Sequence, residues 1–171
     1  MERTYFLTTA RAGFSRWSPD DRPLAHLLWG DPQVTRYLCK SGRFTPEEVD
    51  ARLELELKNG QALGLQYWPL FTLGEGEFIG CCGLRPEGEA LNLGFQLRPA
   101  FWGQGYGPEC AQAVIKYAFD TLGIKRLIAG HHPDNSRSQR ALAKLGFRPT
   151  GPELYPPTGL MYPGYILLAE K

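Results

Sequence analysis

Residues 97–117 read LRPAFWGQGYGPECAQAVIKY and join an apolar strand to an amphipathic helix through a glycine-rich turn. Gly103, Gly105 and Gly107 lack a Cβ atom, so their backbone N–H groups can turn toward a ligand that approaches closely. The first N–H groups of a helix have no internal partners and lie at the positive end of the helix dipole. The stretch therefore predicts an anion site, and a βα turn without a ligand is the alternative.

Two common phosphate-binding motifs do not fit this stretch. Residues 103–107 supply GxGxG, whereas a dinucleotide fingerprint needs G-x-G-x-x-G and an acidic residue about 20 positions later. A P-loop needs Gly-Lys-Ser/Thr, which the chain lacks.

Three blocks of sequence together resemble the GNAT N-acetyltransferases, most closely their RimJ/RimL-type branch. Residues 102–107 (WGQGYG) resemble the family's CoA-pyrophosphate motif. Residues 133–138 (PDNSRS) and 143–147 (AKLGF) resemble the branch's P-x-N-x-x-S…KLGF motif. Residues 7–21 (LTTARAGFSRWSPDD) and 31–38 (DPQVTRYL) resemble its opening strand and helix. The resemblance covers almost the whole chain, and it implies one GNAT domain over residues 1–171.

The fold that the resemblance implies is an α/β (mixed α+β) fold with a central, mostly antiparallel mixed seven-stranded sheet flanked by helices. Periodicity and turn residues predict the elements but not the strand order. We expect strands over 11–17, 65–73, 77–85, 90–98 and 125–131, one starting at Phe147, and one over 164–169. We expect helices over 18–29, 33–38, 45–58, 107–122 and 135–145. Asn59-Gly60 is expected to end the third helix, and residues 152–163 to form a proline-rich loop.

Composition is that of a soluble globular protein of 171 residues, with 43% hydrophobic residues and a net charge of +1. This charge predicts no nucleic-acid or membrane partner. The N-terminus has no apolar signal core, so we expect a cytoplasmic protein. The four cysteines form no C-x-x-C, which argues against a zinc or redox motif. Cys81 and Cys82 are expected to point to opposite faces of one strand.

The resemblance implies acetyl-CoA as cosubstrate and no metal. It assigns the pyrophosphate to the N–H groups of the turn, the pantetheine arm to the end of the preceding strand, and a further CoA contact to an asparagine. The cofactor-binding residues expected on this basis are Gln96, Leu97, Gly103, Gln104, Gly105, Tyr106, Gly107 and Asn135. Asn135 is alternatively an N-cap. Ser138 matches a serine near the thioester sulfur and is the candidate donor to the leaving thiolate, or alternatively a helix-surface serine.

Two positions depart from the family pattern. Leu142 stands where many members have a tyrosine, which leaves Ser138 or water to protonate the thiolate. Asn92 stands where the branch commonly has a glutamate, and an asparagine cannot accept a proton. Another group therefore serves as base, or the amine needs little help. An α-amine of pKa about 7.7–8.0 is roughly 10–30% neutral near neutral pH, against ~0.1% for lysine, which favours an α-amine.

The other candidates for the site are weaker. His131 and His132 close a predicted strand near the site, where they are either a general base or a strand-end pair. His26 is expected to be structural or to lie in the substrate cleft. Candidate lining residues of the acceptor cleft, with core packing as the alternative for most, are Trp29, Arg36, Tyr37, Tyr67, Trp68, Tyr155 and Tyr162. Six scattered acids, most of them expected to be solvated, are Glu47, Glu48, Glu54, Glu56, Glu75 and Glu77.

The sequence thus predicts an enzyme that transfers an acetyl group from acetyl-CoA to a primary amine by direct attack in a ternary complex. A protein N-terminal α-amine is the favoured acceptor. The alternatives are an aminoglycoside or small-amine N-acetyltransferase, and a non-catalytic acyl-CoA-binding module. We expect an amine-bearing acceptor as partner and a monomer or homodimer.

Overall fold

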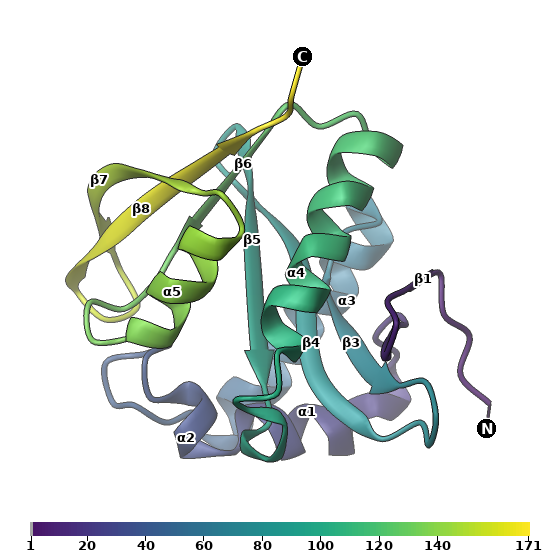
Figure 1. Cartoon of the computed structure of the whole chain (residues 1–171). Coiled ribbons are helices and arrows are strands. Elements are labelled where there is room, and N and C mark those ends of the chain that lie inside the picture. The colour runs from purple at the N-terminus through teal and green to yellow at the C-terminus, as the bar shows by residue number, and fades with distance from the viewer. Residues whose placement is uncertain (1) are drawn as a thin grey trace.

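The computed structural model describes residues 2–171 and contains one eight-stranded sheet. The strands are β1 (Leu7–Thr8), β2 (Ala12–Phe14), β3 (Tyr67–Thr72), β4 (Phe78–Glu87), β5 (Ala90–Leu97), β6 (Arg126–Gly130), β7 (Arg148–Tyr155) and β8 (Leu160–Leu168). Their order across the sheet is β1-β2-β3-β4-β5-β6-β8-β7 (Figure 1). Only β5 and β6 pair in parallel. The predicted mixed, mostly antiparallel sheet is therefore confirmed.

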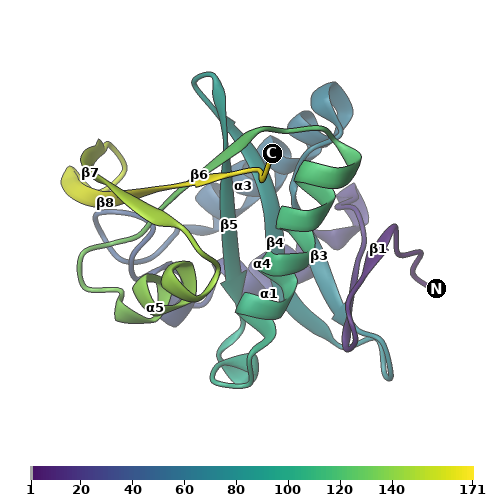
Figure 2. The same cartoon turned by 45° about the horizontal axis from the view of Figure 1, so that its top comes forward.

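Helices cover both faces of this sheet (Figure 2). They are η1 (Pro19–Asp21), α1 (Arg22–Trp29), α2 (Pro32–Thr35), α3 (Pro46–Leu63), η2 (Pro99–Phe101), α4 (Tyr106–Lys116) with a π-helical last turn η3 (Tyr117–Thr121), and α5 (Ser136–Lys144). Helices α1 and α3 enclose one core with Trp29, Leu53 and Cys81. Helix α4 encloses the other with Cys82 and Val114. Cys81 and Cys82 thus point to opposite faces, as predicted.

Two expectations about the first half of the chain need correction. The eighth strand is β1, whose two residues are too few for a periodic pattern to indicate. Helix α3 does not end at Asn59-Gly60 but continues to Leu63, and Gly64 closes it in the left-handed conformation with φ 68°. A Cβ on Gly60 would lie 2.4 Å from Nε2 of Gln66. The glycine therefore makes room for a packed side chain and is not a helix stop.

The predicted proline-rich loop over 152–163 is also wrong, because most of these residues belong to the hairpin of β7 and β8. Strand β7 is the outer strand of the sheet, so Pro149 and Pro152 interrupt no second ladder. Pro163 lies just before Gly164, where the pairing of β8 with β6 begins. Proline is compatible with strands at such edge positions, and composition alone therefore suggested a loop.

Candidate active site

Strands β5 and β6 are paired only where β5 begins. The register joins Leu91 to Leu127 and Asn92 to Ile128, and β5 then runs on to Leu97 without a β6 partner among the described residues. This partial pairing splits the middle of the sheet.

The backbone of Phe95 faces this split. The N–H of Arg98 donates to the carbonyl of Ile79 at 2.9 Å, which fixes the even-numbered residues of β5 as those that hydrogen-bond to β4. Residues 93, 95 and 97 therefore direct their backbone groups away from β4. The Leu97 carbonyl already accepts from Trp102 Nε1 at 2.8 Å. Phe95, which sequence reasoning missed, is left with its N–H and C=O turned toward the split.

A cleft of about 1200 Å³ occupies the split and has two halves. Helices α4 and α5 lie on the same side of the sheet (Figure 1). The loop half of the cleft adjoins both helices, and its lining includes Trp102, Gly103, Gly105, Tyr106, Gly107, Asn135 and Arg137. The tyrosine half includes side chains from the side covered by α3, and its lining includes Tyr37, Arg52, Tyr67, Arg85, Glu87, Asn92, Tyr155 and Tyr162.

The glycine-rich turn of the loop half presents free backbone donors. Gly103 and Gly105 have φ of 72° and 82°, a left-handed conformation that glycine adopts without strain. Gly105 is the N-cap of α4, and within the described residues no backbone acceptor is found for the N–H groups of residues 103–105. The next two N–H groups start the helix and have no intrahelical partner. The arrangement suits a phosphate group.

An ion pair from the start of the sheet holds this turn. Arg11 Nε donates to Glu109 Oε2 at 2.8 Å, and Arg11 Nη2 donates to the Gln104 carbonyl at 2.9 Å. Its guanidinium carbon also lies 4.0 Å from the centre of the Tyr106 ring. Glu109 lies in the first helical turn, where its charge would repel a bound phosphate. Arg11 offsets that charge, and no local pattern in the sequence indicated this pairing across 98 positions.

Helix α5 forms another wall of the cleft and carries two predicted residues. Asn135 is the N-cap, since its Oδ1 accepts from the Ser138 N–H at 3.2 Å. This bond leaves the amide Nδ2 of Asn135 for a ligand, so both interpretations remain compatible. Ser138 lines the cleft, and its role as proton donor stays a prediction. Three cations that line the cleft from the same helix, and that sequence analysis did not single out, are Arg137, Arg140 and Lys144.

The two departures from the family pattern have different environments. Leu142 is 3% exposed and packs in the α4 core, so no proton donor replaces it locally. Asn92 lies at the cleft wall, where its Oδ1 accepts from the Tyr67 hydroxyl at 3.0 Å. Its Nδ2 donates to Glu87 Oε2 at 2.6 Å. The carboxylate that the sequence lacks at position 92 is thus supplied beside it by Glu87, which sequence reasoning missed because the strand register brings the two together.

His131, the first histidine of the pair, has a structural role. His131 is 5% exposed, and its Nδ1 faces the His132 carbonyl at 2.8 Å and so must donate. Its Nε2 then accepts from the Tyr165 hydroxyl at 2.9 Å. His132 Nδ1 accepts from the Asp134 N–H at 3.0 Å, and the ring packs on Tyr37 with centroids 4.6 Å apart. Both rings are thus held by contacts within the protein.

The expected cleft aromatics divide into two groups. Tyr37, Tyr67, Tyr155 and Tyr162 line the cleft, as does Arg36. Trp29 and Trp68 are instead buried in the two cores. Trp29 Nε1 donates to the side-chain oxygen of Gln96 at 2.7 Å, and Gln96 also lines the cleft, so its contact with a cofactor stays a prediction.

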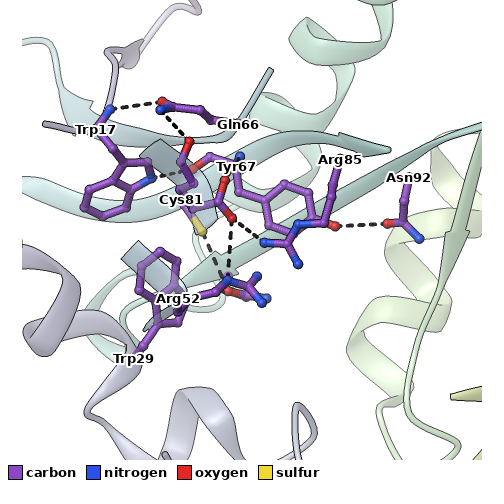
Figure 3. Close-up of polar contacts among 10 residues, drawn as sticks. Trp17, Trp29, Arg52, Gln66, Tyr67, Cys81, Arg85 and Asn92 are labelled. Carbon is purple, nitrogen blue, oxygen red and sulfur yellow. Dashed lines mark hydrogen bonds and ion pairs between the residues drawn. The ribbon is translucent and has the colours of Figure 1, made fainter. Parts of the chain in front are cut away.

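Glu56 is the exception among the acids expected to be solvated. It is 0% exposed, and its Oε2 accepts from the Tyr67 N–H at 2.8 Å (Figure 3). Arg85 and Arg52 both approach its other oxygen.

His26 forms a hydrogen bond with Asp50, with 2.7 Å between Nε2 and Oδ1, and so joins α1 to α3. Over residues 2–171 no cluster of three potential metal-ligating side chains occurs. In the same range, none of the helices has the length and apolarity of a membrane span.

Known proteins resemble this chain in sequence and in architecture. Residues 11–148 match the acetyltransferase (GNAT) domain family. The N-acetyltransferase p20 of Bacillus licheniformis is 28% identical over 158 residues, covering 88% of this chain and 85% of that protein. The ribosomal protein uS5-alanine N-acetyltransferase of Escherichia coli is 35% identical over 98 residues, covering 55% of this chain and 49% of that protein. The crystal structure of an acetyltransferase from Agrobacterium tumefaciens superposes with a TM-score of 0.81 at 23% identity, covering 99% of both chains. This chain therefore belongs to the GNAT family of N-acetyltransferases and has a ribosomal-protein acetyltransferase among its relatives, as the sequence motifs implied.

Proposed function

We propose that the protein transfers an acetyl group from acetyl-CoA to a primary amine, with an α-amine as the favoured acceptor. The observation that carries this proposal is the split between β5 and β6, which joins a turn of free N–H donors to a tyrosine-lined half of the same cleft. A thioester donor with a phosphorylated tail fits one half, and an amine fits the other.

In this proposal the backbone holds the donor. The N–H groups of residues 103–107 bind the pyrophosphate, and each charge-assisted hydrogen bond contributes about 1.5–3 kcal/mol. The peptide-like pantetheine arm pairs with the free backbone of Phe95 in the manner of an added strand. Gln96 and Leu97 remain the neighbouring candidates, and Asn135 contributes its free amide Nδ2. A backbone N–H in this region also polarises the thioester carbonyl.

The acetyl group passes directly from the thioester to the amine, through a tetrahedral intermediate. The amine nitrogen attacks the carbonyl carbon, a C–N bond forms, and the C–S bond breaks with its electron pair going to sulfur. Ser138 or water protonates the thiolate. The proton lost by the attacking nitrogen goes to Glu87, which Asn92 holds at the cleft wall.

The choice of an α-amine rests on basicity and on a relative. An α-amine is partly neutral near pH 7 and needs only modest help from a carboxylate that is itself exposed. The related E. coli protein is named for acetylating an alanine of a ribosomal protein.

The test is release of CoA thiol from acetyl-CoA in the presence of separate panels of α-amines, lysine-bearing peptides, aminoglycosides and polyamines. We expect release with α-amines to exceed release with the other panels. Preferred turnover of lysine side chains would refute the α-amine assignment. Tight binding of acetyl-CoA without release for any amine would favour a non-catalytic acyl-CoA-binding module.

A further inference from the structure

Two guanidinium groups share one carboxylate in the wall of the tyrosine half of the cleft (Figure 3). Arg85 Nη2 donates to Glu56 Oε1, and Arg52 Nε lies 3.5 Å from the same oxygen. The second oxygen of Glu56 is taken by the Tyr67 N–H. The Glu56 side chain is fully buried, whereas those of Arg52 and Arg85 are 14% and 23% exposed.

The charges in this cluster do not balance. Burial raises the pKa of the Tyr67 hydroxyl and raises the pKa of the Cys81 thiol to about 12, so both neighbours are neutral near pH 7. Two positive charges therefore face one negative charge. A buried charge is costly unless it is paired.

The other acids along the cleft do not supply the missing charge. Glu87 is held by Asn92, Glu153 lies on the exposed outer strand, and Asp134 lies beside His132. Within residues 2–171, none of the three forms an ion pair with Arg52 or Arg85.

The two guanidinium groups also have unused donors. Arg52 Nε and Arg85 Nε are buried, and Arg52 Nε faces Glu56, so neither atom is offered to a ligand. Among the described residues, no hydrogen bond is found for the Nη groups of Arg52 or for Nη1 of Arg85, and both side chains line the cleft. Aromatic rings hold both guanidinium groups in place. The guanidinium carbon of Arg85 lies 4.4 Å from the centre of the Tyr67 ring, and that of Arg52 lies 5.3 Å from the centre of the Trp29 ring. A guanidinium fixed in this way is pre-organised for a planar oxyanion.

We infer that the acceptor carries a carboxylate group, which Arg52 and Arg85 bind while its amine lies toward Asn92 and Glu87. This inference rests on the proposed acetyl transfer and narrows its substrate. Arg85 and Asn92 are directly opposite in the register of β4 and β5. Side chains at such positions begin about 5 Å apart, so the carboxylate and the amine are separated by only a few bonds. A free α-amino acid fits this spacing.

The test compares acceptors that differ only in this charge. Acetyl-CoA turnover is measured with the common α-amino acids, with their α-amides, and with dipeptides whose second residue is Asp or Asn. We expect kcat/KM for the best amino acid to exceed that for its amide by roughly 10- to 100-fold. A preference found only between Asp and Asn dipeptides would place the carboxylate in a peptide side chain and overturn the free amino acid as acceptor.

Variants connect this preference to the two arginines. Arg52→Gln should remove most of the preference, and Arg52→Lys, which keeps the charge but loses the planar fork, should remove part of it. Arg126→Gln is the matched control, since Arg126 is exposed on β6 and outside the cleft lining. The inference is overturned if acids and amides react equally well, or if Arg52→Gln leaves the preference intact, and either result leaves the acetyl transfer itself standing.

A binding measurement decides the inference even if no amine is turned over. Calorimetry with the intact protein and CoA compares N-acetylated amino acids with their N-acetylated amides. Tighter binding of the acids, lost in Arg52→Gln, supports the carboxylate site although the proposed reaction would then have failed. Equal binding, or no binding of either set, rejects it.

Discussion

The two halves of the cleft differ in which groups of the protein line them. The glycine-rich turn of the loop half presents backbone groups from one continuous stretch, held by Arg11 and Glu109. The tyrosine half consists of side chains from the segment after α2, from α3, β3, β4 and β5, and from the β7–β8 hairpin. A backbone site binds what every member of a family shares, because its chemistry does not depend on side chains. A side-chain site can change with single substitutions, and under the proposed function it is where acceptor choice would be determined.

The largest effect we expect is on the stability of the tyrosine half. Glu56→Gln would leave two buried guanidinium groups without a counter-charge, and breaking such a pair costs about 3–5 kcal/mol. Chemical denaturation measures the loss in the free energy of unfolding. Glu54→Gln is the matched control on the same helix, because Glu54 pairs with Lys58 at the exposed surface, where a pair contributes about 0–1 kcal/mol. Equal losses of unfolding free energy in the two variants would show that the buried cluster stabilises the fold no more than the exposed pair does.

The next effect concerns proton transfer at the junction of the halves. Glu87→Gln should lower kcat by about 10²-fold or more and leave KM for acetyl-CoA unchanged, since a positioned base contributes about 10²–10⁴-fold. Glu89→Gln, in the same turn but outside the cleft lining, should be silent. Adding Asn92→Glu to the Glu87 variant should recover part of kcat. The turnover number is the decisive readout: a kcat in Glu87→Gln equal to that of the unmodified protein would remove Glu87 from the reaction.

A smaller effect is expected in the loop half. Gly105 has φ 82°, so a valine there is strained by more than about 1–2 kcal/mol and shifts the N–H donors of the turn. KM for acetyl-CoA should rise roughly tenfold. Gly123→Val is the control, because Gly123 has φ 67° beyond the far end of α4, with open space around it. That variant should lose similar stability with KM unchanged. A raised KM in both would indicate general loosening of the helix.

The smallest effect is a pH dependence at a residue outside the cleft lining. Hydrogen bonds from Arg22 and then His26 hold the pKa of Asp50 below its usual value. A carboxyl whose pKa is lower in the folded state stabilises the fold above its unfolded pKa of about 3.9, and this contribution is lost as pH falls through the folded pKa. Asp50→Asn should therefore flatten the acid side of a plot of unfolding free energy against pH. Parallel curves for the two proteins would contradict the linkage.

The same contrast explains what could be predicted from sequence. The turn of the loop half and the N-cap Asn135 follow from local rules, because glycine conformation and helix termini are encoded within a few residues. The cluster of Arg52, Glu56 and Arg85 spans two elements, α3 and β4, and 34 positions in the chain. No local pattern separates a buried glutamate on α3 from its solvated neighbours, so Glu56 was misjudged.

Register is the second reason for the missed residues. Asn92 and Glu87 meet because β4 and β5 pair with Glu87 opposite Ala90, and that register is settled by the packing of both faces. The prolines of β7 are ambiguous in sequence for the same reason. Whether Pro152 lies in a loop or in a strand depends on whether the strand is at the edge of the sheet, which is a property of the whole sheet.

The edge position of β7 has a consequence for how this protein tolerates change. An outer strand normally offers unpaired N–H groups to other chains and invites aggregation. Pro149 and Pro152 have no N–H to offer, and the opposite edge, β1, is only two residues long. The hairpin that carries Tyr155 and Tyr162 can therefore accumulate substitutions, and alter the acceptor, without creating an edge strand that pairs with other chains. New specificities can be selected there at little risk to solubility.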